Sequence, residues 1–264
     1  MDANDYIQIK ASIKRSFNID LVHYKDEQMK RRLDSWLVRA HAESWKEYFQ
    51  LLSTDTTELE RFRNYLTINV TEFFRDTNRW DSVRQDILPY LIKNSKENPQ
   101  AGGLKLWSAG CSIGTEAYTM AIMLDESAPT QKYTLLATDL DRGALLKAKA
   151  RGPYSQDDIR SLTPLQRRKY LTAAAPFHAV ESLQKNIRFQ EQNLIADRFE
   201  TGFDLIVCRN VVIYFTTETK DILYAKFSAA LRPGGVLFVG GTEIISGSSK
   251  FGLQSFGISF YKKA

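Results

Sequence analysis

The sequence predicts an α/β fold in which a mostly parallel sheet follows a helical N-terminal domain. Before about residue 100 the apolar residues recur at helical spacing, and no convincing strand is present. After it, short and nearly all-apolar segments alternate with helical ones, which is typical of a parallel sheet covered by helices on both faces. Strands are expected at residues 104–108, 133–138, 187–190, 203–208 and 236–239, and helices at residues 115–126, 142–150 and 217–231.

Three further stretches predict how the chain is divided. KENPQAGG, at residues 96–103, contains proline and two glycines and is expected to be a loop or linker. Residues 151–186 are too long for a simple crossover, and TPLQRRKYL within them indicates a helix, so we expect an inserted subdomain. FGLQSFGISFYKK predicts a final antiparallel edge strand. The expected domains are a helical domain at residues 1–76, a connecting helix and linker at 77–103, and an α/β domain at 104–264.

The composition is that of a soluble globular protein, with 43% hydrophobic and 25% charged residues in a chain of 264. No run approaches the ~18 apolar residues that a membrane span needs, and MDANDYIQIK lacks the layout of a secretory signal. The two cysteines, Cys111 and Cys208, argue against a disulfide framework. We therefore expect a cytoplasmic protein without membrane insertion.

Basic residues are concentrated near the N-terminus. Residues 10–40 contain eight Lys or Arg against four acidic residues, and Lys25, Arg32 and Arg39 share one helix face because they are seven residues apart. A docking surface for an acidic partner and a solvated helix face both explain this pattern, and charge alone favours the solvated face. The formal net charge of +5 is too small to indicate a nucleic-acid partner.

The first expected strand runs into a glycine turn and a helix, LWSAGCSIGTEAYT. Gly110 and Gly114 give the turn, but neither the dinucleotide fingerprint nor the P-loop pattern is present. Glu116 stands in the first helical turn, where its carboxylate would repel a pyrophosphate. The same residue type is also favoured there because it complements the helix dipole.

Two other strand ends carry polar residues, and ligands of such sheets bind beyond the carboxyl ends of the strands. Asp139 lies 25 residues beyond Gly114, where a carboxylate can accept hydrogen bonds from ribose hydroxyls, although Asp139 or Asp141 can instead cap the next helix. Arg209 and Asn210 follow the strand that ends at Cys208. A ligand with a nucleoside, a positive charge and no phosphate fits all three ends, and S-adenosylmethionine is such a ligand.

The motifs reached so far resemble those of the chemotaxis receptor methyltransferases, the CheR family. The matching stretches are NVTEFFRD, LWSAGCSIGTEAYTMAI, ATDLD, QNLI, DLIVCRNVVIYF and LRPGGVLFVGGTE, in the order in which the family has them. They span residues 69–243, about two thirds of the chain. The resemblance implies a class I S-adenosylmethionine-dependent methyltransferase, with a Rossmann-like, mostly parallel sheet, an N-terminal helical domain and a small inserted β-subdomain.

The resemblance also implies roles for individual positions. Cofactor contacts are expected at Asn69, Thr71, Arg75, Glu116, Asp139, Asn193, Leu194, Arg209 and Asn210. The first three belong to a segment that closes over the cofactor, Glu116 to its amino group and Asp139 to its ribose, while Asn193 and Leu194 match positions beside the adenine. Arg75 and Tyr214 are the expected catalytic residues. Thr115 replaces an acid that some relatives carry, which leaves Glu116 as the candidate carboxylate in that turn.

The implied reaction is methyl transfer from S-adenosylmethionine to glutamate side chains in the cytoplasmic regions of chemoreceptors, with S-adenosylhomocysteine as product. Receptor signalling regions are acidic, so the basic helix around Lys25, Arg32 and Arg39 becomes a plausible docking face. Some relatives grip a receptor C-terminal pentapeptide with the β-subdomain. Residues 151–186 show no Asn-Gly hairpin signature, so the sequence leaves that activity open.

The implied chemistry needs no general base, because a glutamate side chain with a pKa near ~4.3 is ionised at neutral pH. Only His23, His41 and His178 are present, none in a strand-end motif, and no metal-ligand spacing occurs, so no metal is expected. Catalysis would then rest on alignment, which contributes roughly 7–11 kcal/mol in good cases. We expect Arg75 and Tyr214 to orient the substrate carboxylate without a tight salt bridge, which would stabilise the attacking anion more than the transition state.

Three other functions share parts of this pattern. A nicotinamide-dependent oxidoreductase is disfavoured by the missing glycine fingerprint and by Glu116. A nucleic-acid methyltransferase would be expected to have a loop like Asn-Pro-Pro-Tyr after the fourth strand, where this chain has RNVVIY. A non-catalytic adaptor would be expected to lose cofactor residues, and here every matched position is filled.

Overall fold

The computed structural model describes residues 3–67, 70–96 and 102–264. It forms two compact units. The first comprises Met1–Ile68 together with Ile213–Asp221, and the second comprises Asn69–Val212 together with Ile222–Ala264. The helical unit thus ends at residue 68 instead of the expected 76, and it takes in a segment from far along the chain. No helix in the described ranges is both long and apolar enough to cross a membrane.

The first unit is helical, as the periodicity predicts. Its elements are α1 Ala3–Phe17, the short 3-10 helix Leu21–His23, α2 Asp26–Arg39, α3 Trp45–Thr54 and α4 Thr56–Leu66. Ser44 and Asp55 cap the last two helices, because their side chains accept backbone N–H groups of the first turn. Three buried aromatic residues form the centre: Trp36 donates a 2.7 Å hydrogen bond to the Tyr48 hydroxyl, and Phe62 stacks on Trp36.

The segment at residues 213–221 joins this unit through backbone pairing that no local sequence pattern indicates. The Lys25 N–H donates to the Tyr214 carbonyl at 3.0 Å, and the Thr216 N–H donates to the His23 carbonyl at 3.0 Å. An antiparallel bridge joins Tyr24 to Phe215 between these two hydrogen bonds. The residues that follow the fourth strand therefore belong structurally to the helical unit.

The second unit contains a seven-stranded sheet in the order β3-β2-β1-β4-β5-β7-β6. The strands are β1 Leu104–Ala109, β2 Tyr133–Asp139, β3 Ile187–Glu191, β4 Phe203–Cys208, β5 Leu231–Val239, β6 Leu253–Ser255 and β7 Phe260–Lys263. The first five are parallel to one another, as predicted, and β7 is antiparallel to β5. The expected single edge strand is two strands, because the chain turns at Gly257, with a φ of 122°, and β6 forms the edge.

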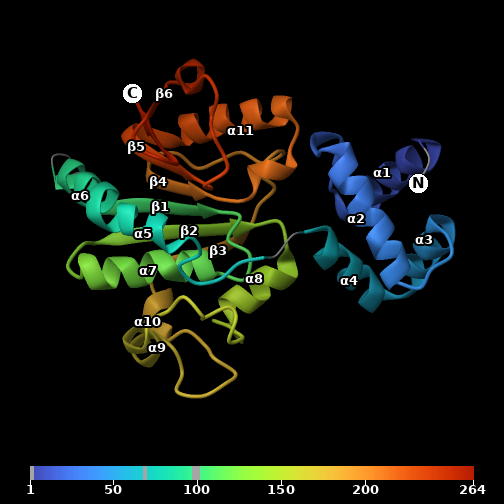
Figure 1. Ribbon diagram of the computed structural model, residues 1–264, viewed down its shortest axis with the longest axis horizontal. Helices are drawn as coiled ribbons and strands as arrows, with labels where there is room; N and C mark the ends of the chain where they lie inside the picture. The colour runs from blue at the N-terminus through green and yellow to red at the C-terminus, as the bar shows by residue number, and fades with distance from the viewer. Residues whose placement is uncertain (1–2, 68–69, 97–101) are drawn as a thin grey trace. The chain divides into compact units, whose positions relative to one another are not determined.

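Helices cover both faces of this sheet (Figure 1). They are α5 Thr77–Ser82, the π-helical turn Val83–Ile87, α6 Leu88–Lys96, α7 Thr115–Ser127, α8 Arg142–Lys149, α9 Pro164–Tyr170, α10 Glu181–Gln184 and α11 Thr217–Ala230. Figure 1 shows α7 and α8 on one face and α11 on the other. On the α11 face, Trp107 packs against Phe203 and Phe227 with ring centroids 5.3 and 5.6 Å apart. The expected linker residues 97–101 lie outside the described residues.

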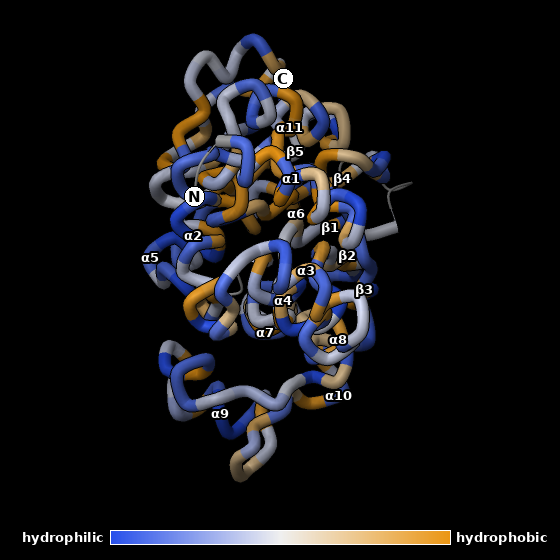
Figure 2. Tube along the Cα trace, turned by 90° about the vertical axis from the view of Figure 1, so that its right-hand side faces the viewer, coloured by the Kyte–Doolittle hydropathy of each residue, from blue (hydrophilic) through white to orange (hydrophobic). Residues whose placement is uncertain are grey.

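The inserted subdomain contains the expected helix, α9, with a capping box at Thr163. Its β-structure is limited to two isolated bridges, Tyr154 with Phe177 and Leu171 with Ala179, and the described residues 151–186 form no strand ladder. Proline at 153 and 176, beside the first bridge, removes the backbone N–H groups that a longer ladder would use. Helix α9 contains four consecutive polar or basic residues, at positions 166–169, and most of it is coloured hydrophilic in Figure 2.

Candidate functional site

The site begins where the strand order reverses, between β1 and its neighbours β2 and β4. The turn after β1 is tight: the N–H groups of Gly110 and Cys111 both donate to the Thr138 carbonyl of β2. Gly110 and Gly114 have φ of 93° and 89°, which disfavours other residues. A Cβ on Gly110 would lie 2.5 Å from Val211 Cγ2, so this turn requires glycine for space as well. The turn places the first residues of α7 directly beyond the ends of β1 and β2.

Glu116 lies in this first turn with its side chain 12% exposed. Ser108 Oγ at the end of β1 donates a 2.7 Å hydrogen bond to Oε1, and Arg209 Nη1 lies 3.8 Å from Oε2. Burial raises the pKa of Glu116 to about 7, although Arg209 and Ser108 both act to lower it. A cationic ligand group beside this carboxylate would favour its ionised form.

Asp139 ends β2, and both of its carboxylate oxygens already accept a backbone hydrogen bond. The Ser112 N–H donates to Oδ2 at 2.7 Å, and the Asp141 N–H donates to Oδ1 at 2.9 Å. Each oxygen keeps a second lone pair, which fits the two hydroxyls of a ribose. Asp141, and not Asp139, caps α8, because its side chain accepts the Ala144 N–H. Burial raises the pKa of Asp139 to about 6, and the backbone hydrogen bonds oppose this shift.

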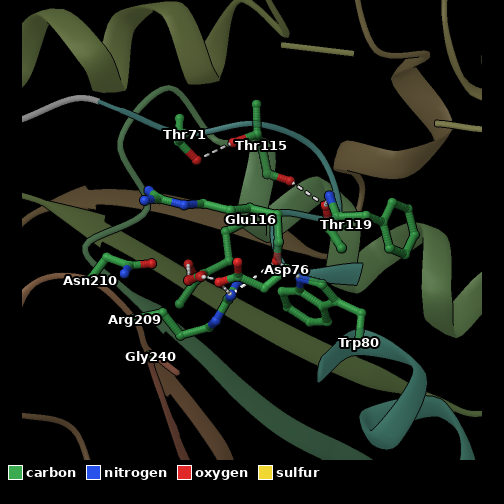
Figure 3. A network of polar contacts seen from close by, with 12 residues as sticks. Thr71, Asp76, Trp80, Thr115, Glu116, Thr119, Arg209, Asn210 and Gly240 are labelled. Carbon is green, nitrogen blue, oxygen red and sulfur yellow. Dashed lines mark hydrogen bonds and ion pairs between the residues drawn. The ribbon is translucent and has the colours of Figure 1, made fainter. Parts of the chain in front are cut away.

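Arg209 follows β4, and its side chain is 3% exposed. Its guanidinium lies against the rings of Trp80 and Phe238, 5.4 and 4.9 Å from their centroids, and these two rings also contact each other. Nη2 donates to the Arg75 carbonyl at 3.0 Å and to Asp76 Oδ2 at 2.5 Å (Figure 3). Arg209 therefore joins the loop after β4 to the segment before α5, and through Glu116 to α7.

That segment, residues 70–76, lies across the start of α7. Thr71 Oγ1 shares a 2.6 Å hydrogen bond with Thr115 Oγ1, and the Phe74 N–H donates to Thr119 Oγ1 at 3.0 Å (Figure 3). The Arg75 Nη1 donates to the Val70 carbonyl at 2.5 Å. These contacts bring Thr71 and Arg75 to the same cluster as Glu116, Arg209 and Asn210. The expected contact residue Asn69 lies outside the described residues.

The loop after β3 carries Asn193 and Leu194. The Gln192 N–H donates to the Asp139 carbonyl at 2.9 Å, which places this loop beside the end of β2. Asn193 Oδ1 accepts the N–H groups of Ile195 and Ala196, so its side chain shapes its own turn. Leu194 is 9% exposed. This loop thus starts beside Asp139, and the contact of Asn193 and Leu194 with an adenine stays a prediction.

Glu243 is a site residue for which no role was expected, although it ends the motif LRPGGVLFVGGTE. It is 5% exposed, and its Oε2 accepts the N–H of Asn210 at 3.0 Å and that of Gly240 at 2.5 Å. It thereby joins the loops after β4 and β5, and Asn210 has the left-handed φ of 59° that this arrangement needs. An acidic residue two positions after the glycine pair, in GGTE, was the available signal. Asp76 was missed in the same way.

A pocket of about 450 Å³, lined mostly by polar and charged residues, adjoins this cluster. It is lined by residues 75–79, Asn210 and residues 241–242, all of the second unit. Tyr214, the other expected catalytic residue, belongs to the first unit, where its carbonyl accepts the Lys25 N–H. The pairing of Tyr214 with Arg75 stays a prediction.

The described residues contain no group of three or more His, Cys, Asp or Glu side chains arranged to hold a metal ion. The fold is a Rossmann-like α/β domain, in which Glu116 stands at the helix start where dinucleotide folds bind phosphate and Asp139 stands at the strand end where they bind ribose. S-adenosylmethionine fits these residues, because Asp139 has acceptors for a ribose and Glu116 can face a cationic amino group.

Comparison with known proteins identifies the family. The model of the CheR methyltransferase SAM-binding domain matches residues 69–258, and that of the CheR methyltransferase all-alpha domain matches residues 4–67. The chain therefore belongs to the CheR methyltransferase family, which acts in chemotaxis and uses S-adenosylmethionine.

Curated relatives match the chain over nearly its whole length. A protein named chemotaxis protein methyltransferase from Listeria monocytogenes is 40% identical over 98% of this chain and 97% of its own. Proteins of the same name from Borreliella burgdorferi and Klebsiella aerogenes are 33% and 32% identical, over 95% and 92% of this chain and 91% and 84% of theirs.

Proposed function

We propose that this protein transfers the methyl group of S-adenosylmethionine to glutamate side chains in the cytoplasmic regions of chemoreceptors, forming glutamate methyl esters in the cytoplasm. The observation that supports this most is the carboxylate of Glu116, partly buried in the turn where a dinucleotide would place a phosphate. Membership of the family supports methyl transfer as the reaction class. A glutamate acceptor is already ionised at neutral pH and therefore needs no general base at the site.

The cofactor would be held along the ends of β1, β2 and β3. Asp139 would accept the ribose hydroxyls, Glu116 would face the amino group, and Asn193 and Leu194 would lie beside the adenine. When bound, the cofactor supplies an electrophilic methyl group on a sulfonium. Residues 70–76 would cover it from the side of α7, because Thr71 is already tied to that helix.

The acceptor carboxylate would be oriented by Arg75. Its guanidinium donates to a neutral backbone carbonyl, that of Val70, and within the described part of the chain no carboxylate forms an ion pair with it. It can therefore align a glutamate by one hydrogen bond. Such a contact orients the nucleophile while leaving most of its charge free to attack, which a tight bidentate pair would not do.

The basic face of α2 remains the proposed receptor-docking surface. Its three basic residues differ in how exposed they are. Lys25 and Arg39 are exposed. Arg32 is only partly exposed: it donates to the Tyr65 carbonyl, and its guanidinium lies 4.2 Å from the Tyr65 ring. Lys25 and Arg39 are thus available to a partner, whereas Arg32 also stabilises the helical unit.

The direct test is incubation with methyl-labelled S-adenosylmethionine and receptor-containing membranes, followed by mild alkali. We expect the label to leave as methanol, because carboxyl methyl esters are cleaved by base. Label that resists alkali would indicate a nitrogen or nucleic-acid acceptor and would overturn the proposal. Membranes whose receptors carry Gln at the target glutamates are the matched control and should stay unlabelled.

A further inference from the structure

The pocket beside the Arg209 cluster has a lining with unbalanced positive charge. Its one carboxylate, Asp76, accepts a hydrogen bond from Arg209 Nη2 at 2.5 Å, so its charge is already compensated. Arg75 and Arg79 both line the pocket, and neither pairs with an acid in the described chain. The pocket is therefore electrostatically suited to an anionic group.

Arg79 is the less constrained of the two arginines. It lies in the last turn of the short helix α5 and is partly exposed, and among the described residues its guanidinium has neither an ion-pair nor a hydrogen-bond partner. Arg84, five residues further on, is a contrast, because its Nη2 lies 3.1 Å from Glu126 Oε2. Asn78 and Thr242 add an amide and a hydroxyl to the same lining.

The position of the pocket in the sheet separates it from the cofactor acids. Glu116 follows β1 and Asp139 ends β2, whereas Asn210 and residues 241–242 follow β4 and β5. In the order β3-β2-β1-β4-β5, Asp139 and the pocket loops lie on opposite sides of β1, and Glu116, 3.8 Å from Arg209, lies between them. The ribose acid is thus on one side of β1, and the pocket opens on the other side, next to the expected cofactor contacts Arg75 and Asn210, where the methyl acceptor would approach.

We propose that this pocket receives an acidic side chain of the acceptor protein that neighbours the methylated glutamate, and that Arg79 is the residue that holds it. The inference rests on the proposed function, since it assumes a protein acceptor at this site. It adds a specificity determinant: the enzyme selects glutamates that have an acidic neighbour.

Arg79 is suited to the neighbouring carboxylate more than to the reacting one. Two guanidinium groups on the attacking carboxylate would stabilise the ground state and slow methyl transfer. A carboxylate that does not react is bound equally well in the ground state and the transition state, so it lowers KM and leaves kcat unchanged. The division of labour is that Arg75 orients the nucleophile and Arg79 anchors the segment that carries it.

The test compares wild type, Arg79→Ala and Arg79→Lys on two receptor cytoplasmic fragments. One fragment has a target glutamate with an acidic neighbour, and in the other that neighbour is changed to glutamine. We expect Arg79→Ala to raise KM for the acidic fragment about tenfold, with kcat within about twofold of wild type, and Arg79→Lys to recover part of the loss. On the glutamine fragment Arg79→Ala should equal wild type. Arg84→Ala is the control and should match wild type on both fragments.

Two binding measurements make the outcomes distinct. Affinity for S-adenosylhomocysteine, measured by calorimetry, should be unchanged in Arg79→Ala, and a parallel loss would assign the pocket to the cofactor and overturn the inference. Equilibrium binding of both fragments, with S-adenosylhomocysteine present, shows without turnover whether Arg79 binds the acidic neighbour. If wild type methylates neither fragment, the proposed function fails, whereas the inference fails only if wild type and Arg79→Ala bind the acidic fragment equally.

Discussion

Glu116 occupies the place in the first turn of α7 where a dinucleotide-binding loop would receive a phosphate. Burial raises its pKa from the ordinary value of 4.5 to about 7, against the effects of Arg209 and Ser108. At a pH between these two pKa values, Glu116 is protonated in the native protein and ionised in the unfolded chain. The stability that Glu116 contributes is therefore complete below pH 4.5 and is lost as the pH rises through 7.

Replacing Glu116 by Gln should remove this pH dependence. We expect the free energy of unfolding of Glu116→Gln, relative to wild type, to increase by about 2 kcal/mol between about pH 5 and about pH 8, in urea titrations. Cofactor affinity should change in the opposite sense, with a loss of roughly tenfold at about pH 8 that diminishes at lower pH, where wild-type Glu116 is itself protonated. Equal cofactor affinity of the two proteins at the higher pH would remove Glu116 from the cofactor site.

The roles of single residues were only partly predictable from the sequence. Asp139 and Asp141 were both open as helix caps, and only the structure shows that Asp141 is the cap. Arg209 was expected to contact the cofactor, but its packing against Trp80 and Phe238 could not be foreseen, because those rings come from distant segments.

At the scale of elements, the second unit depends on side chains that tie loops together. Glu243 joins the loops after β4 and β5, and Arg209 joins the former to the segment before α5. The strands themselves were well predicted, because buried parallel strands are short apolar runs with glycine turns. The contacts that Glu243 and Arg209 make between loops were not predicted. Each of them joins two loops that come close only because of the order of the strands in the sheet.

Glu243→Ala should show how much the tie between these two loops contributes. The change leaves the N–H groups of Asn210 and Gly240 without their acceptor, so we expect a loss of about 1–3 kcal/mol in the free energy of unfolding, measured in urea. Glu243→Gln keeps an acceptor oxygen and should recover most of that loss. If Glu243→Gln is as unstable as Glu243→Ala, the charge and not the hydrogen bonding is what matters.

At the scale of the whole molecule, the helical unit contains residues that follow β4 as well as the N-terminal helices. No sequence pattern indicates this, because the pairing of Lys25 with Tyr214 joins residues remote in the chain. The basic face of α2 is predictable from spacing alone, but the spacing does not show that Arg32 packs on Tyr65 while Lys25 and Arg39 stay exposed.

Charge reversal on that face should test receptor docking. The double variant Lys25→Glu with Arg39→Glu should slow receptor methylation several-fold at low ionic strength, because it repels an acidic partner. The defect should shrink at high salt, where wild type is itself slowed. Methylation at the wild-type rate in low salt would restore the interpretation of a solvated face. Arg32 is a poor choice for this test, since its replacement would disturb the helical unit.

We propose that this enzyme works by aligning an already ionised carboxylate, with Arg75 as the orienting group. Arg75→Ala tests it most directly, by single-turnover methyl transfer to receptor membranes together with calorimetry of cofactor binding. We predict a loss of about 100-fold or more in the transfer rate and a change of less than about fivefold in cofactor affinity. Equal losses in the two quantities would contradict the account and make Arg75 a cofactor-binding residue alone.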